Sequence, residues 1–234
     1  LAKDDGQSFI WRQNFVKSIV ERDIQEFKTS PHMRTLKLLQ LLSYYHGQTL
    51  NYEKLSVYLD ITGRSVRDYI EVLESMYFVR RLPQFHKNTK KRLIKSPKIY
   101  IRDSGILHSI ARIETETELK LHPLYGFSFE GYVIENLISI FNDADVSYYR
   151  TSNGEEIDLV LEKNGKTIAV EVKTSKEPTL SAKSQSAIKS IKPDHTFIIV
   201  PSYEKAYTSK HAFGDLTIGD ILQVVKKIKK IFRN

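Results

Sequence analysis

The sequence predicts an α/β (α+β) protein in which a helical N-terminal part precedes a C-terminal part built around a sheet. Apolar residues recur at helical spacing through the early part of the chain. Two runs of alternating apolar residues flank the pair Asn164-Gly165, a pattern typical of a β-hairpin. Helix and strand patterns also lie on both sides of that hairpin. Together these three observations indicate the fold class.

In the N-terminal part we expect helices over residues 9–27, 33–46, 51–59 and 65–77, and then a strand over residues 78–82. Asn51 is suited to cap a helix, and Gly63 is suited to the tight turn between the last two helices. Short helices with a tight glycine turn, followed by strands, match a winged helix-turn-helix.

The helix over residues 65–77 would occupy the position of a DNA-recognition helix. Arg64 and Arg67 are its candidate nucleic-acid contacts, but Asp68, Glu71 and Glu74 balance them. A DNA-reading helix normally carries more basic residues at its N-terminal end. A packing module and a DNA reader therefore both remain open.

The segment over residues 86–98 contains basic residues and no acidic ones. It is expected to form a wing or an exposed ribbon, either as a solvated loop or as a phosphate-contacting surface. Its basic residues are Lys87, Lys90, Lys91, Arg92, Lys95 and Lys98.

The chain should then continue with a strand over residues 98–103, a helix over 106–111 and an acidic linker over 114–118. A domain boundary is expected near Pro123. A helix over residues 127–141 follows, and Glu130 lies within its apolar stripe. A carboxylate facing a core is costly unless it is paired. Glu130 would therefore pair with a metal site at the hairpin or with a neighbouring group.

The C-terminal part is expected to contain a strand over residues 146–150, the hairpin, a helix over 180–191, a strand over 196–200 and a final helix over 220–232. If Asn164 and Gly165 are the central turn residues, paired hairpin residues have numbers that sum to 329. This register places Asp158 opposite Glu171 and Glu156 opposite Lys173, with Ile157 opposite Val172 on the other, apolar face.

Two like charges directly opposite one another destabilise a sheet. A divalent cation would turn the repulsion between Asp158 and Glu171 into coordination, since Mg²⁺ binds carboxylate oxygens and keeps several waters. Lys173 would lie on the same face and act on a metal-activated water. The alternative is a solvated hairpin face that carries a surface ion pair between Glu156 and Lys173.

The composition limits the possible functions. The 234 residues include 36 Lys and Arg against 28 Asp and Glu, a formal net charge of +8. This balance favours a nucleic acid or an anionic membrane surface as partner. The lack of cysteine excludes disulfides, thiolate metal sites and a cysteine nucleophile, and it fits a reducing, cytoplasmic compartment. No apolar run is long enough to predict a membrane span.

Asp158 on one strand and Glu171-Val172-Lys173 on the next resemble the PD-(D/E)XK nuclease superfamily. The order helix, strand, Asp strand, Glu-x-Lys strand, helix, strand is similar to its restriction-endonuclease-like αβββαβ core. The wider layout resembles the C-terminal region of bacterial and archaeal P-loop AAA-type ATPases, a domain of unknown function. The segments that carry this second resemblance are FVKSIVERDI at 15–24, KIYIRDSG at 98–105, FEGYV at 129–133, GEEID at 154–158 and VEVK at 170–173.

The resemblance implies that an ATPase domain, which would hold the ATP, precedes Leu1. Residues 1–30 would then be a connecting helix, residues 31–122 a winged helix-like domain with the basic loop, and residues 123–234 a nuclease-like domain. Gly165-Lys166-Thr167 looks like the end of a P-loop, but it lies in the hairpin, so no ATP site is expected there.

The implied catalytic residues are Asp158, Glu171 and Lys173, with Glu130 as the acidic residue on the helix. Asp158 and Glu171, joined by Glu130 or Glu156, would hold Mg²⁺ or Mn²⁺.

Three functions follow from these patterns. The leading one is a Mg²⁺-dependent phosphodiesterase that acts on DNA and is coupled to the protein's own ATPase domain. The second is a catalytically inactive DNA-binding or regulatory module of that ATPase. The third is an interaction domain that assembles ATPase rings as a homo-oligomer, for which the sequence gives no direct evidence. Fold alone does not decide among them.

Overall fold

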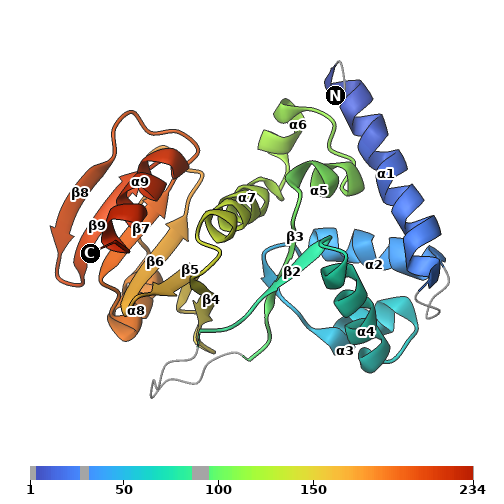
Figure 1. Ribbon diagram of the computed structural model, residues 1–234, viewed down its shortest axis with the longest axis horizontal. Helices are drawn as coiled ribbons and strands as arrows, with labels where there is room; N and C mark the ends of the chain where they lie inside the picture. The colour runs from blue at the N-terminus through green and yellow to red at the C-terminus, as the bar shows by residue number, and fades with distance from the viewer. Residues whose placement is uncertain (1–3, 27–31, 86–94, 234) are drawn as a thin grey trace. The chain divides into compact units, whose positions relative to one another are not determined.

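The computed structural model describes residues 4–26, 32–85 and 95–233 and has the mixed α+β composition that the sequence predicts (Figure 1). The chain forms two compact units. The first unit comprises Leu1–Arg81 and Lys98–Gly131, and the second comprises Leu82–Pro97 and Tyr132–Asn234. The two units divide within one helix, a few residues beyond Pro123.

Helices dominate the first unit. Its elements are α1 (Asp5–Glu26), α2 (His32–Tyr44), β1 (Gln48–Thr49), α3 (Tyr52–Leu59), α4 (Gly63–Ser75), β2 (Val79–Leu82), β3 (Lys98–Ile101), α5 (Ser104–Ile110) and α6 (Glu116–Leu121). The strands form a small sheet in the order β1-β3-β2. The four N-terminal helices, α1 to α4, and the strands β2 and β3 are those that the sequence predicts.

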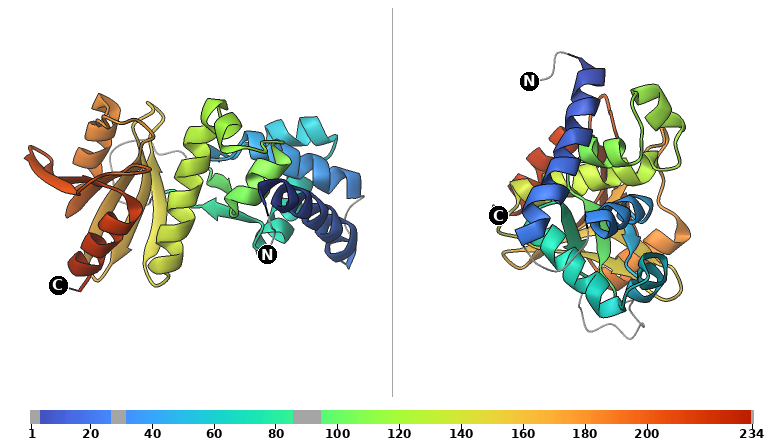
Figure 2. Two further views of the ribbon diagram at one scale, coloured as in Figure 1. Left: turned by 90° about the horizontal axis from the view of Figure 1, so that it is seen from above. Right: turned by 90° about the vertical axis from the view of Figure 1, so that its right-hand side faces the viewer.

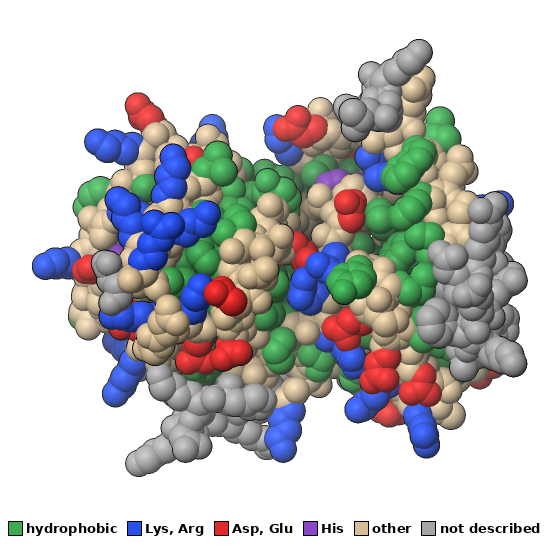
Figure 3. Space-filling model, viewed as in Figure 1, with side chains coloured by type: hydrophobic (Ala, Val, Ile, Leu, Met, Phe, Trp, Pro, Cys, Tyr) green, Lys and Arg blue, Asp and Glu red, His purple; other side chains and the backbone are tan. Residues whose placement is uncertain are grey.

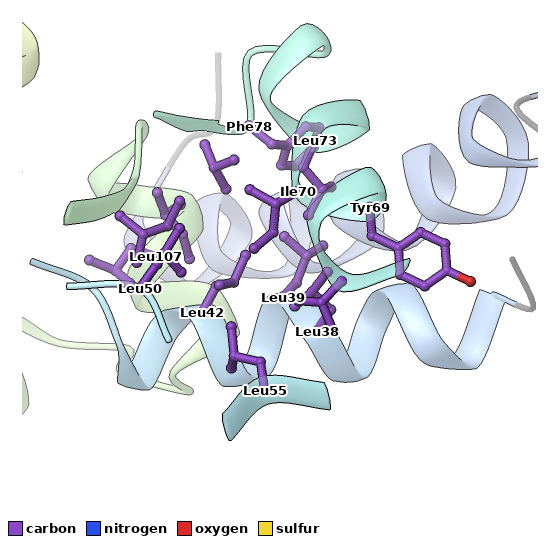
Figure 4. Packing of buried hydrophobic residues seen from close by; sticks show 14 of the residues in the cluster. Leu38, Leu39, Leu42, Leu50, Leu55, Tyr69, Ile70, Leu73, Phe78 and Leu107 are labelled. Carbon is purple, nitrogen blue, oxygen red and sulfur yellow. The ribbon is translucent and has the colours of Figure 1, made fainter. Parts of the chain in front are cut away.

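The core of this unit forms where α2 packs against α3, α4 and α5 (Figure 4). Leu38 and Leu42 of α2, Leu55 of α3, Ile70 of α4 and Leu107 of α5 are each no more than 1 % exposed. Burying a leucine or isoleucine side chain contributes about 1.5–3 kcal/mol. These residues recur at helical spacing in the sequence because one face of each helix must enter this core.

Side-chain caps set several helix boundaries. The Asn51 side chain accepts a hydrogen bond from the Lys54 amide at 2.9 Å, as expected for a cap. The Thr62 hydroxyl accepts one from the Ser65 amide at 3.1 Å, so α4 begins at Gly63. Gly63 therefore belongs to the helix and is not the turn residue that the sequence suggested.

The expected acidic linker over residues 114–118 is wrong, because part of this segment forms α6. Thr115 and Glu118 form a reciprocal capping box at its start. Such a box satisfies two backbone donors that a helix N-terminus leaves unpaired. A run of glutamates is typical of a charged linker, but at the first turn of a helix the same residues also match the helix dipole.

The second unit contains a mixed sheet. Its elements are the C-terminal part of α7 (Tyr125–Ile140), β4 (Asp145–Arg150), β5 (Glu156–Lys163), β6 (Lys166–Val172), α8 (Ala182–Ile191), β7 (His195–Ile199), β8 (Tyr207–His211), β9 (Gly214–Gly219) and α9 (Ile221–Ile231). From α7 to β7 the order is helix, three strands, helix and strand, as expected from the sequence. The hairpin of β8 and β9 was not predicted.

The six strands lie in the order β4-β5-β6-β7-β9-β8. The β6–β7 and β7–β9 pairs are parallel, and the other pairs are antiparallel. Helices α8 and α9 lie on opposite sides of this sheet (Figure 2). On the α8 side, Val160 of β5 and Ala169 of β6 pack with Ala187 and Ile188 of α8. The largely polar hairpin face is therefore partly covered, as the two apolar residues on it indicate.

The register of the β5–β6 hairpin is the predicted one. Leu159 pairs with Val170 and Leu161 with Ile168, so the residue numbers sum to 329. Asn164 and Gly165 have φ values of 52° and 72°, which the predicted type I′ turn requires. The local turn chemistry therefore fixes the pairing of the two strands that carry the acidic residues.

A β-bulge interrupts the pairing of β4 with β5. Ser147 pairs with Val160 but Tyr149 pairs with Ile157, so one residue of β4 faces two of β5, and Asp158 is one of these two. The alternation of faces shifts accordingly, and Ile157 packs in the same cluster as Val160. The expectation that Ile157 lies on the face opposite Val160 is therefore wrong. Bulges commonly re-aim a side chain in this way.

Candidate functional site

Asp158 and Glu171 meet at one end of the β5–β6 hairpin, as the register requires. The regular ladder runs up to the pair Leu159–Val170, immediately before the two acidic residues. Asp158 Oδ2 accepts a hydrogen bond from the backbone N–H of Val172 at 2.9 Å. The Asp158 carboxylate is thus held against the strand that carries Glu171.

Glu171 is an acidic side chain in the protein interior, with 4 % of its surface exposed. Its Oε1 accepts hydrogen bonds from Lys173 Nζ at 2.7 Å and from Ser184 Oγ at 3.1 Å. Its Oε2 is buried and has no hydrogen-bond partner among the described residues. Such an oxygen is costly unless a proton, a water or a cation satisfies it.

The electrostatic surroundings favour the protonated form of this carboxyl group. Burial, and then the negative charge of Asp158, raise the pKa of Glu171 to about 8. Lys173 and Ser184 act in the opposite direction but do not compensate. The two acidic residues therefore lie close enough to repel one another, which is the property that a bound cation would relieve.

Sequence reasoning missed Ser184. This buried residue lies in the first turn of α8, where its amide donates to the N-cap residue Ser181 at 3.0 Å. Its hydroxyl reaches across to Glu171 of β6. The Ser-x-x-Ser spacing marks a helix start, but only the packing of α8 on the sheet shows which carboxylate the second serine meets.

The structure gives Glu156 a partner other than the predicted one. Arg150 of β4 forms an ion pair with Glu156 at 2.9 Å, while Lys173 forms one with Glu171 at 2.7 Å. Strand β6 ends at Val172, so Lys173 lies just beyond the ladder in which it was expected to face Glu156.

Glu130 belongs to the first unit, where it is buried and paired. Its Oε1 accepts from Lys98 Nζ at 2.9 Å and from the Tyr100 hydroxyl at 2.5 Å. Of the two roles expected for Glu130, the structure shows this pairing with neighbouring groups. Lys98 is 2 % exposed, so its expected place on an exposed basic ribbon is wrong.

The remaining predicted nucleic-acid contacts fall into two groups. Arg64, Arg67 and Lys95 are exposed, and the Arg67 guanidinium lies 4.7 Å from the centre of the Tyr52 ring. The other four residues, Lys87, Lys90, Lys91 and Arg92, lie outside the residues that the structure describes.

Two carboxylates at this site, those of Asp158 and Glu171, are available to hold a metal ion. Among residues 4–26, 32–85 and 95–233, the structure brings no three His, Cys, Asp or Glu side chains into a metal-binding group. Mg²⁺ is commonly held by one or two carboxylates together with waters and substrate phosphates. Asp158 and the unpartnered Oε2 of Glu171 therefore fit a Mg²⁺ ion that keeps most of its waters.

No helix within the described parts of the chain is long and apolar enough to cross a bilayer.

Comparisons with known proteins find two sequence families. Residues 1–117 match the family described as domain of unknown function DUF8612, and residues 125–217 match domain of unknown function DUF4143. Uncharacterized proteins of Mycobacterium tuberculosis and Mycobacterium bovis are each 31% identical to the chain over 201 residues. The alignment covers 86% of this chain but 46% of each relative, so the chain spans less than half of their length.

Proposed function

The chain belongs to the family described as domain of unknown function DUF8612, and we propose that its second unit is a Mg²⁺-dependent phosphodiesterase acting on DNA. The observation that carries the proposal is the buried Oε2 of Glu171, which lacks a hydrogen-bond partner among the described residues and belongs to a carboxyl group whose pKa is raised by burial and then by Asp158. A site built only for stability would not place two acidic residues in this way.

Asp158 and Glu171 would hold the cation. The Oδ2 of Asp158 is oriented by the Val172 amide, and Oε1 of Glu171 is oriented by Ser184, so neither carboxylate is free to turn away. Such restraints on the ligands commonly matter for metal affinity. A bound divalent cation would polarise a phosphate and lower the pKa of a water molecule.

Lys173 would act beside the cation. Its ammonium group donates to Glu171 Oε1, yet one third of its side chain is exposed, so it can also reach an incoming phosphate. A positive group fixed at this position stabilises the negative charge that develops on the phosphate oxygens. Glu171 lies near the end of β6 and Lys173 directly beyond it, so the proposed metal ligand and the ammonium group lie at the same end of the strand.

DNA is the proposed substrate because of the chain's charge and its first unit. The formal net charge of +8 favours a polyanion, and Arg64 and Arg67 extend from the exposed side of α4. In this reading the first unit is a winged helix-like module, and the second has the restriction-endonuclease-like core. We also propose that an ATPase domain belongs to the same protein, which ATP hydrolysis by one of the longer mycobacterial relatives would test.

Cleavage of supercoiled plasmid in Mg²⁺ or Mn²⁺ tests this function. The wild-type chain should nick plasmid, and EDTA, Asp158→Asn or Lys173→Ala should abolish nicking. Glu162→Gln is the matched control, because it removes an acidic residue from the same strand β5 at a distance from the pair. Equal nicking by all four proteins would assign the activity to a contaminant and refute the proposal.

Calorimetric titration with Mn²⁺ measures the cation site directly. Asp158→Asn should weaken binding at least about tenfold, whereas Glu162→Gln should not. Wild-type protein that binds no divalent cation would remove the basis for catalysis.

One observation favours a catalytically inactive DNA-binding module as the second candidate. Glu156 and Glu130 pair with Arg150 and Lys98, so the described residues supply two carboxylates where four were considered. In that case DNA binding should fall steeply with salt, persist in EDTA and survive Asp158→Asn, while plasmid stays intact.

A further inference from the structure

The exposed side of α9 and the segments beside it carry mainly basic side chains, with Glu204 and Asp215 as the acidic residues beside them. In the space-filling view, Lys and Arg side chains gather over the part of the molecule that contains β8, β9 and α9 (Figure 3). The exposed residues of this α9 cationic surface are Lys205, Lys210, Lys226, Lys229, Lys230 and Arg233.

Buried contacts hold α9 in place. Val224 and Ile228 are fully buried, and the side-chain amide of Gln223 donates to the Tyr203 carbonyl at 2.9 Å. Lys227 Nζ donates to Thr208 Oγ1 of β8 at 2.9 Å. Helix α9, β8 and the loop before β8 are therefore packed together, and their basic residues lie on one continuous folded surface.

The six basic side chains have no hydrogen-bonding or ion-pair partner among the described residues. Lys226 and Lys230 are four residues apart on α9. Like charges at this spacing destabilise a helix by about 0.2–0.5 kcal/mol per pair. The surface therefore carries a cost that an opposite charge from a partner would remove.

Structural roles account for only part of this charge. Lys229 and Lys230 lie in the last turn, where the helix dipole favours cations. Lys210 lies on the edge strand β8, where a lysine discourages pairing with another sheet. Neither reason applies to Lys226 or Lys205.

We propose that the α9 cationic surface binds the phosphate backbone of a nucleic acid. Lysine ammonium groups are compact charges suited to phosphate contacts, which position a nucleic acid without reading its sequence. A membrane is the less suitable partner, because a helix that inserts into a bilayer must expose its apolar face. Val224, Val225 and Ile228 of α9 lie in the core, and Leu222 is its one large apolar side chain that is strongly exposed.

This surface is separate from the acidic pair. Helix α8, which contacts Glu171, and α9 lie on opposite sides of the sheet (Figure 2). The Asn164 side chain donates to the Phe232 carbonyl at 3.1 Å, so the end of α9 lies at the turn of the β5–β6 hairpin. The acidic pair lies at the far end of the same strands. This inference rests on the proposed function only for the choice of a nucleic acid as the ligand. Binding at this surface does not require cleavage.

Fluorescence anisotropy with a labelled 30-base-pair duplex in EDTA tests the proposal with the whole chain. The variant Lys226→Gln/Lys229→Gln/Lys230→Gln should bind the duplex at least about tenfold more weakly at 0.1 M salt. The reason is that counterion release at each neutralised phosphate raises the affinity about eightfold at this salt concentration. The slope of log affinity against log salt should fall by about 0.9 for each phosphate that the variant no longer neutralises. Lys176→Gln/Lys189→Gln/Lys192→Gln is the charge-matched control, with three exposed lysines outside the surface.

An unchanged affinity of the first variant, or an equal loss in both variants, would overturn the proposal. Glu162→Gln, which lies outside both the acidic pair and this surface, should bind the duplex like wild type, and EDTA keeps the measurement independent of cleavage. Vesicles containing phosphatidylserine provide the competing ligand. Lysine-dependent binding to vesicles without lysine-dependent binding to duplex would assign the surface to a membrane and reject nucleic acid. Circular dichroism checks that each variant is folded.

Discussion

The ionisation of Glu171 should make the stability of the second unit fall as pH rises. The folded-state pKa of this carboxyl group is raised from 4.5 to about 8. Below pH 4.5 the group is protonated in both states and costs nothing. Between the two values the folded state binds more protons than the unfolded chain, so the free energy of unfolding decreases with pH until it levels off above pH 8.

The size of the effect follows from the same shift. One pKa unit corresponds to about 1.4 kcal/mol, so the full shift is worth up to about 5 kcal/mol. Glu171 is almost wholly buried, so solvent screening reduces this little, but relaxation of the site makes it an upper bound. At pH 7 the destabilisation from Glu171 should be about 3 kcal/mol or less.

The measurement compares urea unfolding of wild type with Glu171→Gln and Glu162→Gln between pH 5 and 9. Trp11 is the single tryptophan and lies on α1, so its fluorescence reports on the first unit while far-UV circular dichroism reports on both. The free energy of unfolding of wild type should fall relative to that of Glu171→Gln as pH rises. The difference in free energy of unfolding between wild type and Glu162→Gln should not change with pH. A Glu171→Gln difference that is also flat would refute the argument.

Divalent cations should reverse this pH effect, because an ion takes the place of the proton on Glu171. Adding Mg²⁺ at pH 8 should stabilise wild type but not Glu171→Gln. Calorimetry below pH 8 in buffers of different ionisation enthalpy should show proton release on binding. Binding without release of protons would place the ion elsewhere.

Two further predictions concern the buried cluster of the first unit, and urea unfolding followed by Trp11 fluorescence tests both. A Cβ at Gly131 would lie 2.3 Å from His46 Nε2, so Gly131→Ala should lower the free energy of unfolding by about 1–3 kcal/mol. Gly126→Ala is the control, because Gly126 lies on the same helix with open space around it, and it should leave stability unchanged or raise it. Equal effects of the two substitutions would contradict this reason. Glu130→Gln should lower the free energy of unfolding by about 3–5 kcal/mol, because it leaves the Lys98 ammonium buried without its counter-charge. A decrease of less than about 1 kcal/mol would show that the pair is not buried in solution.

The sequence was most informative where the local signal was strong. Asn164-Gly165 and the alternation around it predicted the hairpin and its register, and through them the meeting of Asp158 with Glu171. Such a turn depends on the φ angles of two adjacent residues, which their own side chains determine. The helix cap at Asn51 could be recognised for the same reason.

The sequence was least informative where two distant segments had to meet. The partners of Glu130, Glu156 and Ser184 come from positions 98, 150 and 171, and no spacing rule connects them. The bulge opposite Tyr148 is also a property of the pairing of two strands, since it adds a residue to one strand relative to its neighbour.

By itself the sequence determined the mixed α+β class, the main helices, the hairpin and the two acidic residues side by side. Only the tertiary structure decided that Glu171 is buried under α8, that one of its oxygens has no partner among the described residues, and that Glu130 is satisfied in the first unit. Turns and helix faces depend on residues a few positions apart, whereas the charge state of a carboxyl group depends on everything packed around it.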